Sequence, residues 1–364
     1  MKILHIITGI QKAAGTSVFC GEVCNGLVAL GHDVTIAVVN PETDDCYPLD
    51  PRIKLISISS LLHAFTRSTR LDYGLIHIHA LWSPALHKVA KWARHNKIPI
   101  VWSPHGMLTP WAMNNKKWKK ILAWWLYQRK DLKMVGLLHA TAESEVDDMR
   151  RMGLKNKVMV APLGVKVNDC VEHVVRADGK KVLLFVSRVQ RKKGLINLVM
   201  AWAQLSPEIK SKWMVRIVGP DQEGHTDELK GLCAKLSVEN NFEFVGPKYG
   251  NDLAQEYASA NLFALPTHSE NFGSVVIEAL AHGVPVICTK GAPWKELDDC
   301  KCGWWINIGV EPLTKALKDA MSLTDIGRSE MGARGKSLIE AKYTWDSVVR
   351  AVLKGYEEVL SAKT

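Results

Sequence analysis

Two glutamates, Glu270 and Glu278, stand eight residues apart in the segment PTHSENFGSVVIEALAHGVPV, which follows a short apolar strand. The pattern predicts a helix that begins near Gly273. The first turn of a helix leaves backbone N–H groups unpaired at the positive end of its dipole. Asn271 to Ser274 are therefore suited to cradle an anion such as a phosphate, with a carboxylate on either side of it.

The spacing of the two glutamates limits their chemistry. If both were helical they would lie roughly 12 Å apart along the axis. Carboxylate pairs that hydrolyse a glycosidic bond flank it at about 5–10 Å. Glu270 and Glu278 fit better at opposite ends of one elongated ligand, such as a nucleotide sugar, in which sugar, diphosphate and ribose follow one another. Spacing alone is equally compatible with two solvated glutamates.

A basic turn follows the strand expected over 182–186. Arg188 closes that strand, and Lys193 lies just before the next helix. Both side chains could reach a diphosphate, Arg188 as a bidentate fork and Lys193 as a point charge. They would stabilise negative charge as a sugar–phosphate bond breaks. An isolated turn of this composition is more often simply solvated.

The loop of residues 8–16 joins the first expected strand to the first expected helix. Gly15, followed by Thr16, would let a phosphate approach the backbone closely. The loop matches neither the dinucleotide-binding G-x-G-x-x-G pattern nor the P-loop pattern, which counts against NAD binding and against ATP hydrolysis.

His105, in SPHGML, follows the strand expected over 98–103. A histidine at a strand's carboxyl end could hydrogen-bond a transferred sugar or an attacking hydroxyl, although a histidine that only caps a loop is the commoner case. His79 in HIHALW and Glu143 in HATAESE occupy similar positions and are weaker candidates for contacting an acceptor.

The segment around Glu270 and Glu278 resembles the E-x7-E signature of retaining glycosyltransferases of the GT-B type, family 4 in particular. The similarity extends from the glycine loop near residue 15 to the last helix. It implies transfer of a sugar from a UDP- or GDP-linked donor to a hydroxyl with retention at the anomeric carbon. It also implies that no metal or other cofactor is required, because Arg, Lys and a helix dipole take the place of a divalent ion.

The resemblance assigns roles to the matching residues. Glu270 would contact the sugar near the reacting carbon, Glu278 the ribose, and Arg188 and Lys193 the diphosphate. It also favours a functional role for His105 in catalysis. The donor-binding set it implies is Gly15, Thr16, Arg188, Lys193, Asn271, Phe272, Gly273, Ser274 and Glu278. Family members often carry two glycines in the first loop, where this chain has Ala14 and Gly15.

The chain has 364 residues, 47% of them hydrophobic, and a formal net charge of +10, which favours an anionic partner. Its eight cysteines include no pair of C-x2-C motifs, so a structural zinc is not expected. The sequence shows no signal peptide and no apolar run of bilayer length. We therefore expect a cytoplasmic protein with reduced thiols.

Alternating apolar strands and amphipathic helices predict an α/β protein with two Rossmann-like, doubly wound domains that face a central cleft. We expect an acceptor-side domain over 1–165, a linker over 166–180, and a donor domain over 181–342. The last segment, 343–364, is expected to form a helix that crosses back to the first domain, as the resemblance implies. The expected strands are 2–7, 34–39, 75–79, 98–103, 137–140, 158–161, 182–186, 214–218, 242–245, 261–265 and 284–288.

The segment of residues 110–133 combines tryptophans with seven basic residues and one acid, Asp131. On a helical wheel the apolar residues form one stripe: Trp118, Ile121, Leu122, Trp125 and Leu132. The basic residues lie roughly opposite: Lys116, Lys119, Lys120 and Lys130. Such a helix could rest on an anionic membrane surface with tryptophans at headgroup level, or its apolar stripe could simply pack on the core. No nucleic-acid-binding module accompanies the charge.

These observations favour a glycosyltransferase that acts on a lipid-linked or polysaccharide intermediate (O-antigen, capsule, exopolysaccharide or lipopolysaccharide) at the inner face of the membrane. Two alternatives stay open. One is a nucleotide-sugar epimerase of the same shape, which would bind a donor without an acceptor. The other is a non-catalytic basic protein that binds membrane surfaces. The sugar, the base and the acceptor are left open by the sequence.

Overall fold

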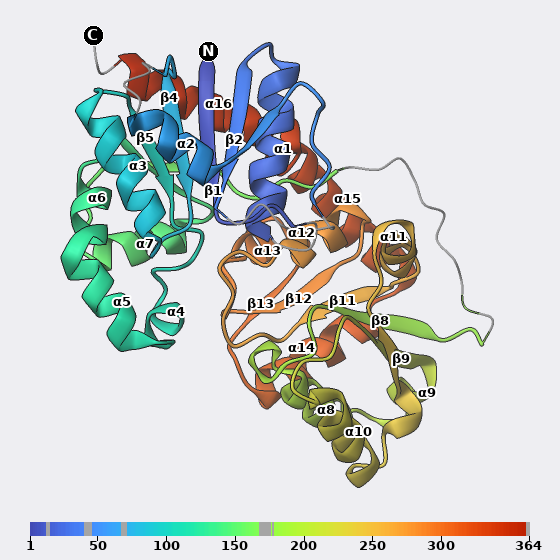
Figure 1. Cartoon of the computed structure of the whole chain (residues 1–364). Helices are drawn as coiled ribbons and strands as arrows, with labels where there is room; N and C mark the ends of the chain where they lie inside the picture. The colour runs from blue at the N-terminus through green and yellow to red at the C-terminus, as the bar shows by residue number, and fades with distance from the viewer. Residues whose placement is uncertain (12–14, 40–45, 67–70, 167–175, 177, 362–364) are drawn as a thin grey trace. The chain divides into compact units, whose positions relative to one another are not determined.

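The structure is a computed structural model that describes all residues except 12–14, 40–45, 67–70, 167–175, 177 and 362–364. The chain forms two compact units, each built on a parallel sheet (Figure 1). Unit 1 comprises Met1–Gly164 together with Trp345–Thr364, and unit 2 comprises Val165–Thr344. Most of the linker expected over 166–180 falls on residues outside the described ones.

Unit 1 holds a sheet that has seven strands in the described residues, in the order β3-β2-β1-β4-β5-β6-β7. Every pair in it is parallel. The order reverses direction between β1 and β4, which makes this the switch point of a doubly wound sheet. The strands are β1 (Lys2–Ile7), β2 (Asp33–Val38), β3 (Lys54–Ser57), β4 (Leu75–His79), β5 (Ile100–Ser103), β6 (Leu137–Ala140) and β7 (Val158–Val160).

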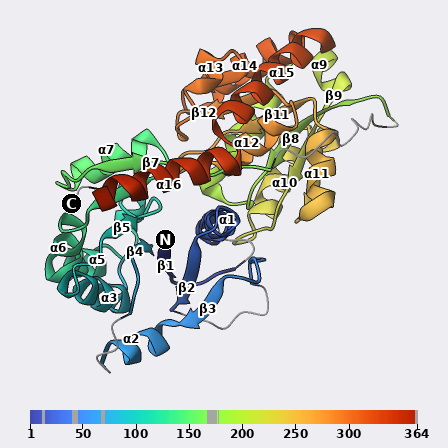
Figure 2. The same ribbon diagram turned by 90° about the horizontal axis from the view of Figure 1, so that it is seen from above.

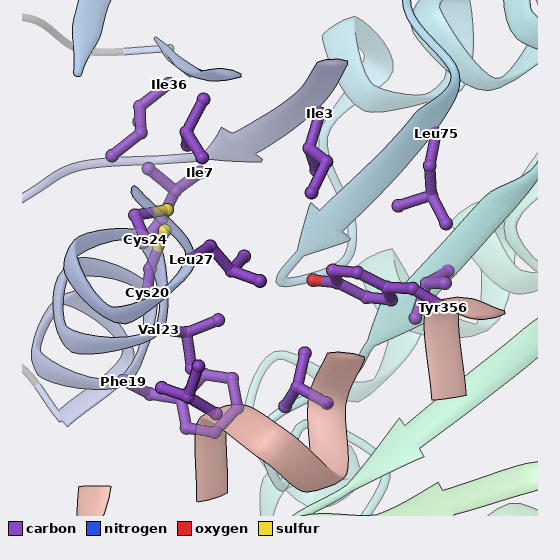
Figure 3. Close-up of a cluster of buried hydrophobic side chains, with 14 of the residues drawn as sticks. Ile3, Ile7, Phe19, Cys20, Val23, Cys24, Leu27, Ile36, Leu75 and Tyr356 are labelled. Atoms are coloured by element: carbon purple, nitrogen blue, oxygen red, sulfur yellow. The ribbon is translucent and has the colours of Figure 1, made fainter. Parts of the chain in front are cut away.

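Helices cover both faces of this sheet. On one face α1 (Gly15–Ala29) packs beside α16 (Trp345–Ser361) over a shared apolar core, as Figures 2 and 3 show. Gly26 of α1 lies so close to α16 that a Cβ there would come within 2.5 Å of Val349. The last helix therefore returns to the first unit, as expected. The other face carries α2 (Ile58–Thr66), α3 (Pro84–His95) and α7 (Glu143–Arg151).

Unit 2 repeats this design with six strands in the described residues, in the order β10-β9-β8-β11-β12-β13. Its pairs are all parallel, and its switch point lies between β8 and β11. The strands are β8 (Lys181–Val186), β9 (Trp213–Val218), β10 (Phe242–Gly246), β11 (Leu262–Leu265), β12 (Val286–Thr289) and β13 (Gly303–Ile306).

The helices of unit 2 form two groups. In one, α8 contacts α10 and α14, and in the other α12 contacts α15; Figure 1 shows them on opposite faces of the sheet. The elements are η2 (Arg191–Lys193), α8 (Leu195–Ala203), α9 (Pro207–Lys212), α10 (His225–Lys235), η3 (Glu239–Asn241), α11 (Gly250–Ala258), α12 (Ser274–Ala281), α13 (Glu296–Asp299), α14 (Val310–Ser322) and α15 (Asp325–Lys342).

The expected architecture of two doubly wound sheets is confirmed. Several elements were missed, among them β3, α2, β13 and α15. The edge strand β3 and the helix α2 after it are short and half exposed. The strand β13 has four residues, two of them tryptophans that are only partly buried. Helix α15 has no sustained apolar period that would reveal it in the sequence. Two of its glycines, Gly332 and Gly335, let it lie close against neighbouring backbone and side chains.

The Trp- and Lys-rich segment is not one continuous helix. It divides into α4 (Pro110–Asn114), α5 (Lys117–Ala123), a π-helical turn η1 (Trp124–Gln128) and α6 (Arg129–Lys133). Lys116 breaks the run with a left-handed backbone, φ 51°. None of the described helices combines the length and apolarity needed to cross a bilayer.

The helical wheel was wrong about which side of this segment faces the core. Its buried side chains are Trp124, Gln128, Asp131 and Leu132. The other four members of the predicted apolar stripe point to solvent, with Trp118 and Trp125 each 68% exposed. The π-helical turn shifts the register by one residue, so a uniform wheel cannot follow both ends of the segment.

Candidate active site

The two loops that flank the switch point of unit 2 carry the predicted diphosphate site. One leaves β8 with Arg188 and η2, and the other leaves β11 and leads into α12. Because β8 and β11 are neighbours in a parallel sheet, their loops emerge side by side. Lys193 Nζ forms an ion pair with Glu270 Oε1, and these side chains are only 9% and 15% exposed. The structure thus joins two predicted site residues that are 77 positions apart.

Backbone hydrogen bonds hold the loop that carries Glu270. Its N–H donates to the Gly291 carbonyl at 2.6 Å, and the His268 N–H donates to the Lys192 carbonyl at 2.9 Å. The buried indole of Trp294 donates from Nε1 to the Phe272 carbonyl at 2.6 Å. The loops after β8, β11 and β12 therefore fix one another, so the loop is pre-organised without a ligand.

At Gly194 the two switch-point loops approach each other closely. Its φ is +72°, and an added Cβ would lie 2.0 Å from the Pro266 carbonyl oxygen. We expect Gly194→Ala to lower the free energy of unfolding by about 3 kcal/mol or more, because left-handed strain adds to a backbone clash. The matched control is Gly246→Ala, at φ +81° with no atom within 4 Å, which should cost about 1–2 kcal/mol.

Denaturant unfolding of the two glycine variants and the parent measures this difference. Equal losses for the two variants would show that the loops do not need this close approach.

Two cations, Lys192 and Lys193, lie near Glu270, and Arg188 lies near Lys192. Burial lowers the pKa of Lys192, and the neighbouring positive charges of Lys193 and Arg188 lower it further, while Glu270 opposes the shift. Arg188 itself is exposed. The N-terminus of α12 begins next to Glu270, with Gly273 as the N-cap in a left-handed conformation, φ 81°. Positive side chains and helical N–H groups therefore converge at one end of the sheet, where an anion would be stabilised by both.

Glu278 lies on α12 and is oriented by a residue that the sequence did not reveal. Tyr257 Oη donates to Glu278 Oε2 at 2.7 Å. Burial raises the pKa of Glu278, while hydrogen bonds from Tyr257 and Ser274 oppose the rise. Burial also raises the pKa of Tyr257 well above its usual value, so the phenol stays protonated and remains a donor. Ser274 thus contacts Glu278 through its side chain as well as standing at the first position of α12.

Unit 1 brings His79 and His105 together at the ends of β4 and β5. His79 Nδ1 lies 2.9 Å from His105 Nε2. His105 has a left-handed backbone, φ 51°, which is uncommon for a residue with a side chain. Burial lowers the pKa of His105 well below its usual value, and nearby His79 and His139 add to the shift. At neutral pH His105 is therefore an uncharged hydrogen-bonding group.

A carboxylate that the sequence did not single out, Glu145, supports the His105 loop. Glu145 is buried and accepts hydrogen bonds from the N–H groups of Gly106 at 2.6 Å and Thr141 at 2.8 Å. Glu143 is exposed at the start of α7. Its proposed contact with an acceptor stays a prediction.

The first loop of unit 1 ends where α1 begins, at Gly15. Gly15 and Thr16 therefore stand in the first helical turn, where backbone N–H groups have no intrahelical partner. Ser17 fixes the start of the loop: its Oγ accepts from the Gln11 N–H at 3.0 Å and donates to the Gly9 carbonyl at 3.1 Å. Ala14 lies outside the described residues.

A hollow of about 460 Å³ lies elsewhere in unit 2, along the amino-terminal ends of the strands. Two of its basic residues already have partners. Lys181 pairs with Asp325 at 2.8 Å, and Arg328 donates to the Leu323 carbonyl and to Asp325. Ligands of doubly wound sheets bind at the carboxyl ends of the strands, so we place the site at the switch point and not in this hollow.

Five buried or half-buried histidines, which we call the histidine cluster, lie under the His105 loop: His5, His77, His79, His105 and His139. Burial lowers the pKa values of four of them, His5, His77, His105 and His139, that of His139 to about 4. The unfolded chain, with pKa values near 6.5, binds more protons than the folded one. The contribution of these histidines to stability is therefore complete above about pH 6.5, and it is lost as the pH falls toward their pKa values in the folded protein.

We expect unit 1 to lose stability between pH 7.5 and pH 5.5, where carboxylates scarcely titrate. His139 alone contributes a loss of about 1.5 kcal/mol over this interval, and the other shifted histidines add to it. Amide hydrogen exchange of the buried strands β1 and β4 measures the change. Identical protection at the two pH values would mean that these histidines are charged in the folded protein.

The comparison with known families decides the identity. Residues 13–169 match the family model described as Glycosyltransferase Family 4, and residues 171–338 match the model Glycosyl transferases group 1. The chain belongs to the family 4 glycosyltransferases.

This family 4 member is similar to the D-inositol 3-phosphate glycosyltransferase of Actinosynnema mirum, with 31% identity over 225 residues that cover 55% of this chain. The chain spans about half the length of that curated relative, 51%. Its fold matches the sucrose-phosphate synthase of Thermosynechococcus elongatus (TM-score 0.77, 18% identity, 100% of each chain). It also matches Anabaena HepE in complex with UDP and glucose (TM-score 0.76, 16% identity, 98% of this chain and 100% of that one). These matches show the GT-B fold.

Proposed function

We propose that this protein transfers a sugar, with retention at the anomeric carbon, from a nucleoside diphosphate sugar to a hydroxyl acceptor. The observation that carries the proposal is the convergence at one switch point of Arg188, Lys193, Glu270 and the N-terminus of α12. Two cations and a helix N-terminus suit a diphosphate, and the carboxylate suits the hydroxyls of the sugar attached to it. Unit 2 would hold the donor and unit 1 the acceptor.

Lys193 and Glu270 gain distinct roles when a donor binds. Without donor, each neutralises the other in a nearly dry loop. A diphosphate would share the Lys193 ammonium, which leaves the Glu270 carboxylate able to accept hydrogen bonds from sugar hydroxyls. Arg188, exposed beside them, would complete the charge on the phosphate side. These cations act most strongly as the sugar–phosphate bond breaks, because negative charge then accumulates on the leaving group.

The proton of the attacking hydroxyl needs a base, and the leaving phosphate can take it. That assignment keeps the acceptor on the same face of the sugar as the departing diphosphate, which accounts for retention. Neutral His105 would orient a sugar or acceptor hydroxyl by a hydrogen bond and would not act as a charged acid. Glu278, held by Tyr257, would contact the ribose of the donor.

We propose UDP as the first nucleotide to test, with GDP as the alternative. The support is the fold shared with HepE, whose structures hold UDP and UDP-glucose. No step proposed here runs through a divalent ion. We therefore expect addition of Mg²⁺ to change the turnover rate by less than about twofold.

The test is an assay of nucleoside diphosphate release from UDP-, GDP- and ADP-sugars with and without a membrane lipid extract. Release that depends on the extract supports transfer. Conversion of the donor sugar without release would identify an epimerase instead. No turnover of any donor would leave a protein that binds without catalysis, and would overturn the proposal.

We further propose that the acceptor is lipid-linked and that unit 1 rests on the inner face of an anionic membrane. The outward side of α5 and η1 exposes Trp118, Leu122, Trp125 and Leu126, between 53% and 70% each. Basic side chains flank them: Lys119 Nζ lies 5.3 Å from the centre of the Trp118 ring, and the Arg129 guanidinium lies 4.8 Å from that of Trp125. This combination of exposed aromatic and basic side chains is typical of helices that lie at a membrane surface.

The only acid of this segment does not face the same way. Asp131 is fully buried. Its carboxylate accepts a hydrogen bond from the Arg94 guanidinium at 2.8 Å, and its Oδ2 lies 2.7 Å from His87 Nδ1. Asp131 therefore anchors α6 to α3 and leaves the outward face without an acidic residue of its own. A basic face with exposed tryptophans is attracted to anionic headgroups, at about 1 kcal/mol per basic residue near the surface.

A further inference from the structure

Two cysteine thiols and two imidazoles meet inside unit 1, out of contact with solvent. Cys20 and Cys24, four residues apart, stand on one face of α1, with their sulfur atoms next to each other in Figure 3. His5 comes from β1 and His79 from the end of β4, the strands at the switch point of the sheet. All four residues are fully buried.

Three of these residues, His5, His79 and Cys20, bring their ligand-capable atoms close together. His5 Nδ1 lies 3.1 Å from His79 Nε2. These two nitrogens and the Cys20 sulfur all lie within 4.8 Å of each other. In a tetrahedral zinc site with Zn–N bonds of about 2.0 Å, two ligand nitrogens lie about 3.3 Å apart. The spacing of the imidazoles is thus already close to that of two ligands on one ion.

The hydrogen-bond chain behind His5 starts from a fixed end. His139 Nε2 lies 2.8 Å from the Ala161 carbonyl oxygen, which can only accept, so Nε2 of His139 carries the proton. In the neutral ring Nδ1 is then an acceptor, and it lies 2.6 Å from Ser103 Oγ, which must donate to it. Ser103 in turn accepts from His77 Nε2 at 2.6 Å. His77 is therefore protonated on Nε2 and accepts at Nδ1.

The same chain sets the tautomer of His5. Tyr356 Oη lies 2.5 Å from His77 Nδ1, so the phenol donates to that nitrogen. Its oxygen is then left to accept from His5 Nε2, 3.5 Å away. His5, neutral and protonated on Nε2, consequently presents the lone pair of Nδ1 to Cys20 and His79. Five partners thus prepare one metal-ligand atom, which is the outer-shell arrangement found behind metal-bound histidines.

We propose that His5 Nδ1, His79 Nε2 and Cys20 Sγ bind one Zn²⁺ ion. Cys24 Sγ, which lies next to Cys20 Sγ but outside this set of three, would turn toward the ion as the fourth ligand. Two thiolates and two imidazoles form one of the ligand sets of structural zinc sites, and the thiolates disfavour Mg²⁺ and Ca²⁺. The far nitrogen of His79 also has a partner: when Nε2 binds the ion, Nδ1 carries the proton and donates to His105 Nε2.

The sequence does not predict this site, because its ligands come from three separate elements, β1, α1 and β4, and include no C-x2-C motif. The ion would tie the first helix to the two strands at the switch point. It would also fix the tautomer of His105 through His79. Its role is distinct from sugar transfer, and its test does not use transfer activity.

The experiment titrates Zn²⁺ and Co²⁺ into chelator-treated, reduced full-length protein. We expect one Zn²⁺ per chain by mass spectrometry of metals, a higher unfolding temperature with zinc, and a thiolate-to-cobalt charge-transfer absorption with Co²⁺. Cys20→Ala should remove the charge-transfer band and weaken zinc binding by more than about 100-fold. Tyr356→Phe, which removes only the hydroxyl behind His5, should weaken it by roughly 10–100-fold.

Cys233→Ala, a buried thiol of unit 2, is the matched control and should bind zinc as the parent does. If Cys20→Ala fails to fold, the cobalt spectrum of the parent still shows whether a thiolate binds the metal ion. A parent that binds no zinc in competition with a micromolar-affinity chelator would overturn the proposal. So would a cobalt spectrum without thiolate charge transfer, or unchanged zinc affinity in a folded Cys20→Ala variant.

Discussion

Lys193→Ala is expected to lower kcat/KM by about 10²–10³, the cost of removing one preorganised group that stabilises developing charge. The nearly buried ammonium of Lys193 pairs directly with the Glu270 carboxylate. Glu270→Gln should cause a loss of similar size, because the amide keeps the shape but not the charge. Steady-state release of nucleoside diphosphate measures both effects.

Stability separates a catalytic role from a structural one in these variants. Each single variant leaves a poorly solvated charge without its partner, so unfolding should be easier by up to about 3 kcal/mol. The double variant Lys193→Ala/Glu270→Gln leaves no unpaired charge and should regain most of the stability while it stays inactive. Lys212→Ala, which removes an exposed lysine of α9, is the control and should change neither property. Wild-type kcat in either single variant would contradict the assigned roles.

Charge reversal at two lysines of α5 is expected to reduce binding to anionic vesicles by about 10²–10³. Lys119→Glu with Lys120→Glu changes the local charge by four, and each charge near the surface is worth about 1 kcal/mol. Trp118→Ala with Trp125→Ala should weaken binding independently, because both side chains are exposed and would lose their place in the headgroup region. Co-sedimentation with vesicles of mixed anionic and zwitterionic lipids measures partitioning.

Lys315→Glu with Lys318→Glu on α14 makes the same change of charge on exposed positions of unit 2. This control should bind vesicles more tightly than the α5 variant does, and all variants should bind nucleotide as the parent does. Equal partitioning of the α5 variant and the parent would contradict the proposal that unit 1 rests on an anionic membrane.

The main features of the donor site could be predicted because they are local in sequence. Glu270, the start of α12 at Gly273 and Glu278 lie within nine residues, and a helix start has the same chemistry wherever it occurs. Arg188 and Lys193 could be placed because a loop after a parallel strand must open at the carboxyl edge of the sheet. The direct pairing of Lys193 with Glu270 could not be read from the sequence, since it depends on which strands are neighbours.

The residues that were missed act across long separations. Tyr257 orients Glu278 from another helix, and Trp294 ties down the Phe272 carbonyl from the loop after β12. Glu145 stands two positions from the predicted Glu143, and only helix geometry decides which of them turns inward to the His105 loop. The exposed face of α5 was hidden by the π-helical turn, which no residue pattern signals.

The histidine cluster has a faint sequence signal. His5, His77 and His139 each interrupt an otherwise apolar strand, which indicates polar groups buried within the sheet. The sequence does not show that they share partners, because the hydroxyls between them come from Ser103 on β5 and Tyr356 on α16. Position in the folded sheet, and not spacing along the chain, determines this part of the molecule.

The most direct test of the donor site is a crystal structure of the protein with UDP bound. We expect the pyrophosphate to lie at the switch point of unit 2, against Lys193 Nζ, the Arg188 guanidinium and the N–H groups of residues 272–274, with the ribose at Glu278. A nucleotide bound at the amino-terminal ends of the strands, or one whose phosphates touch none of these groups, would contradict it.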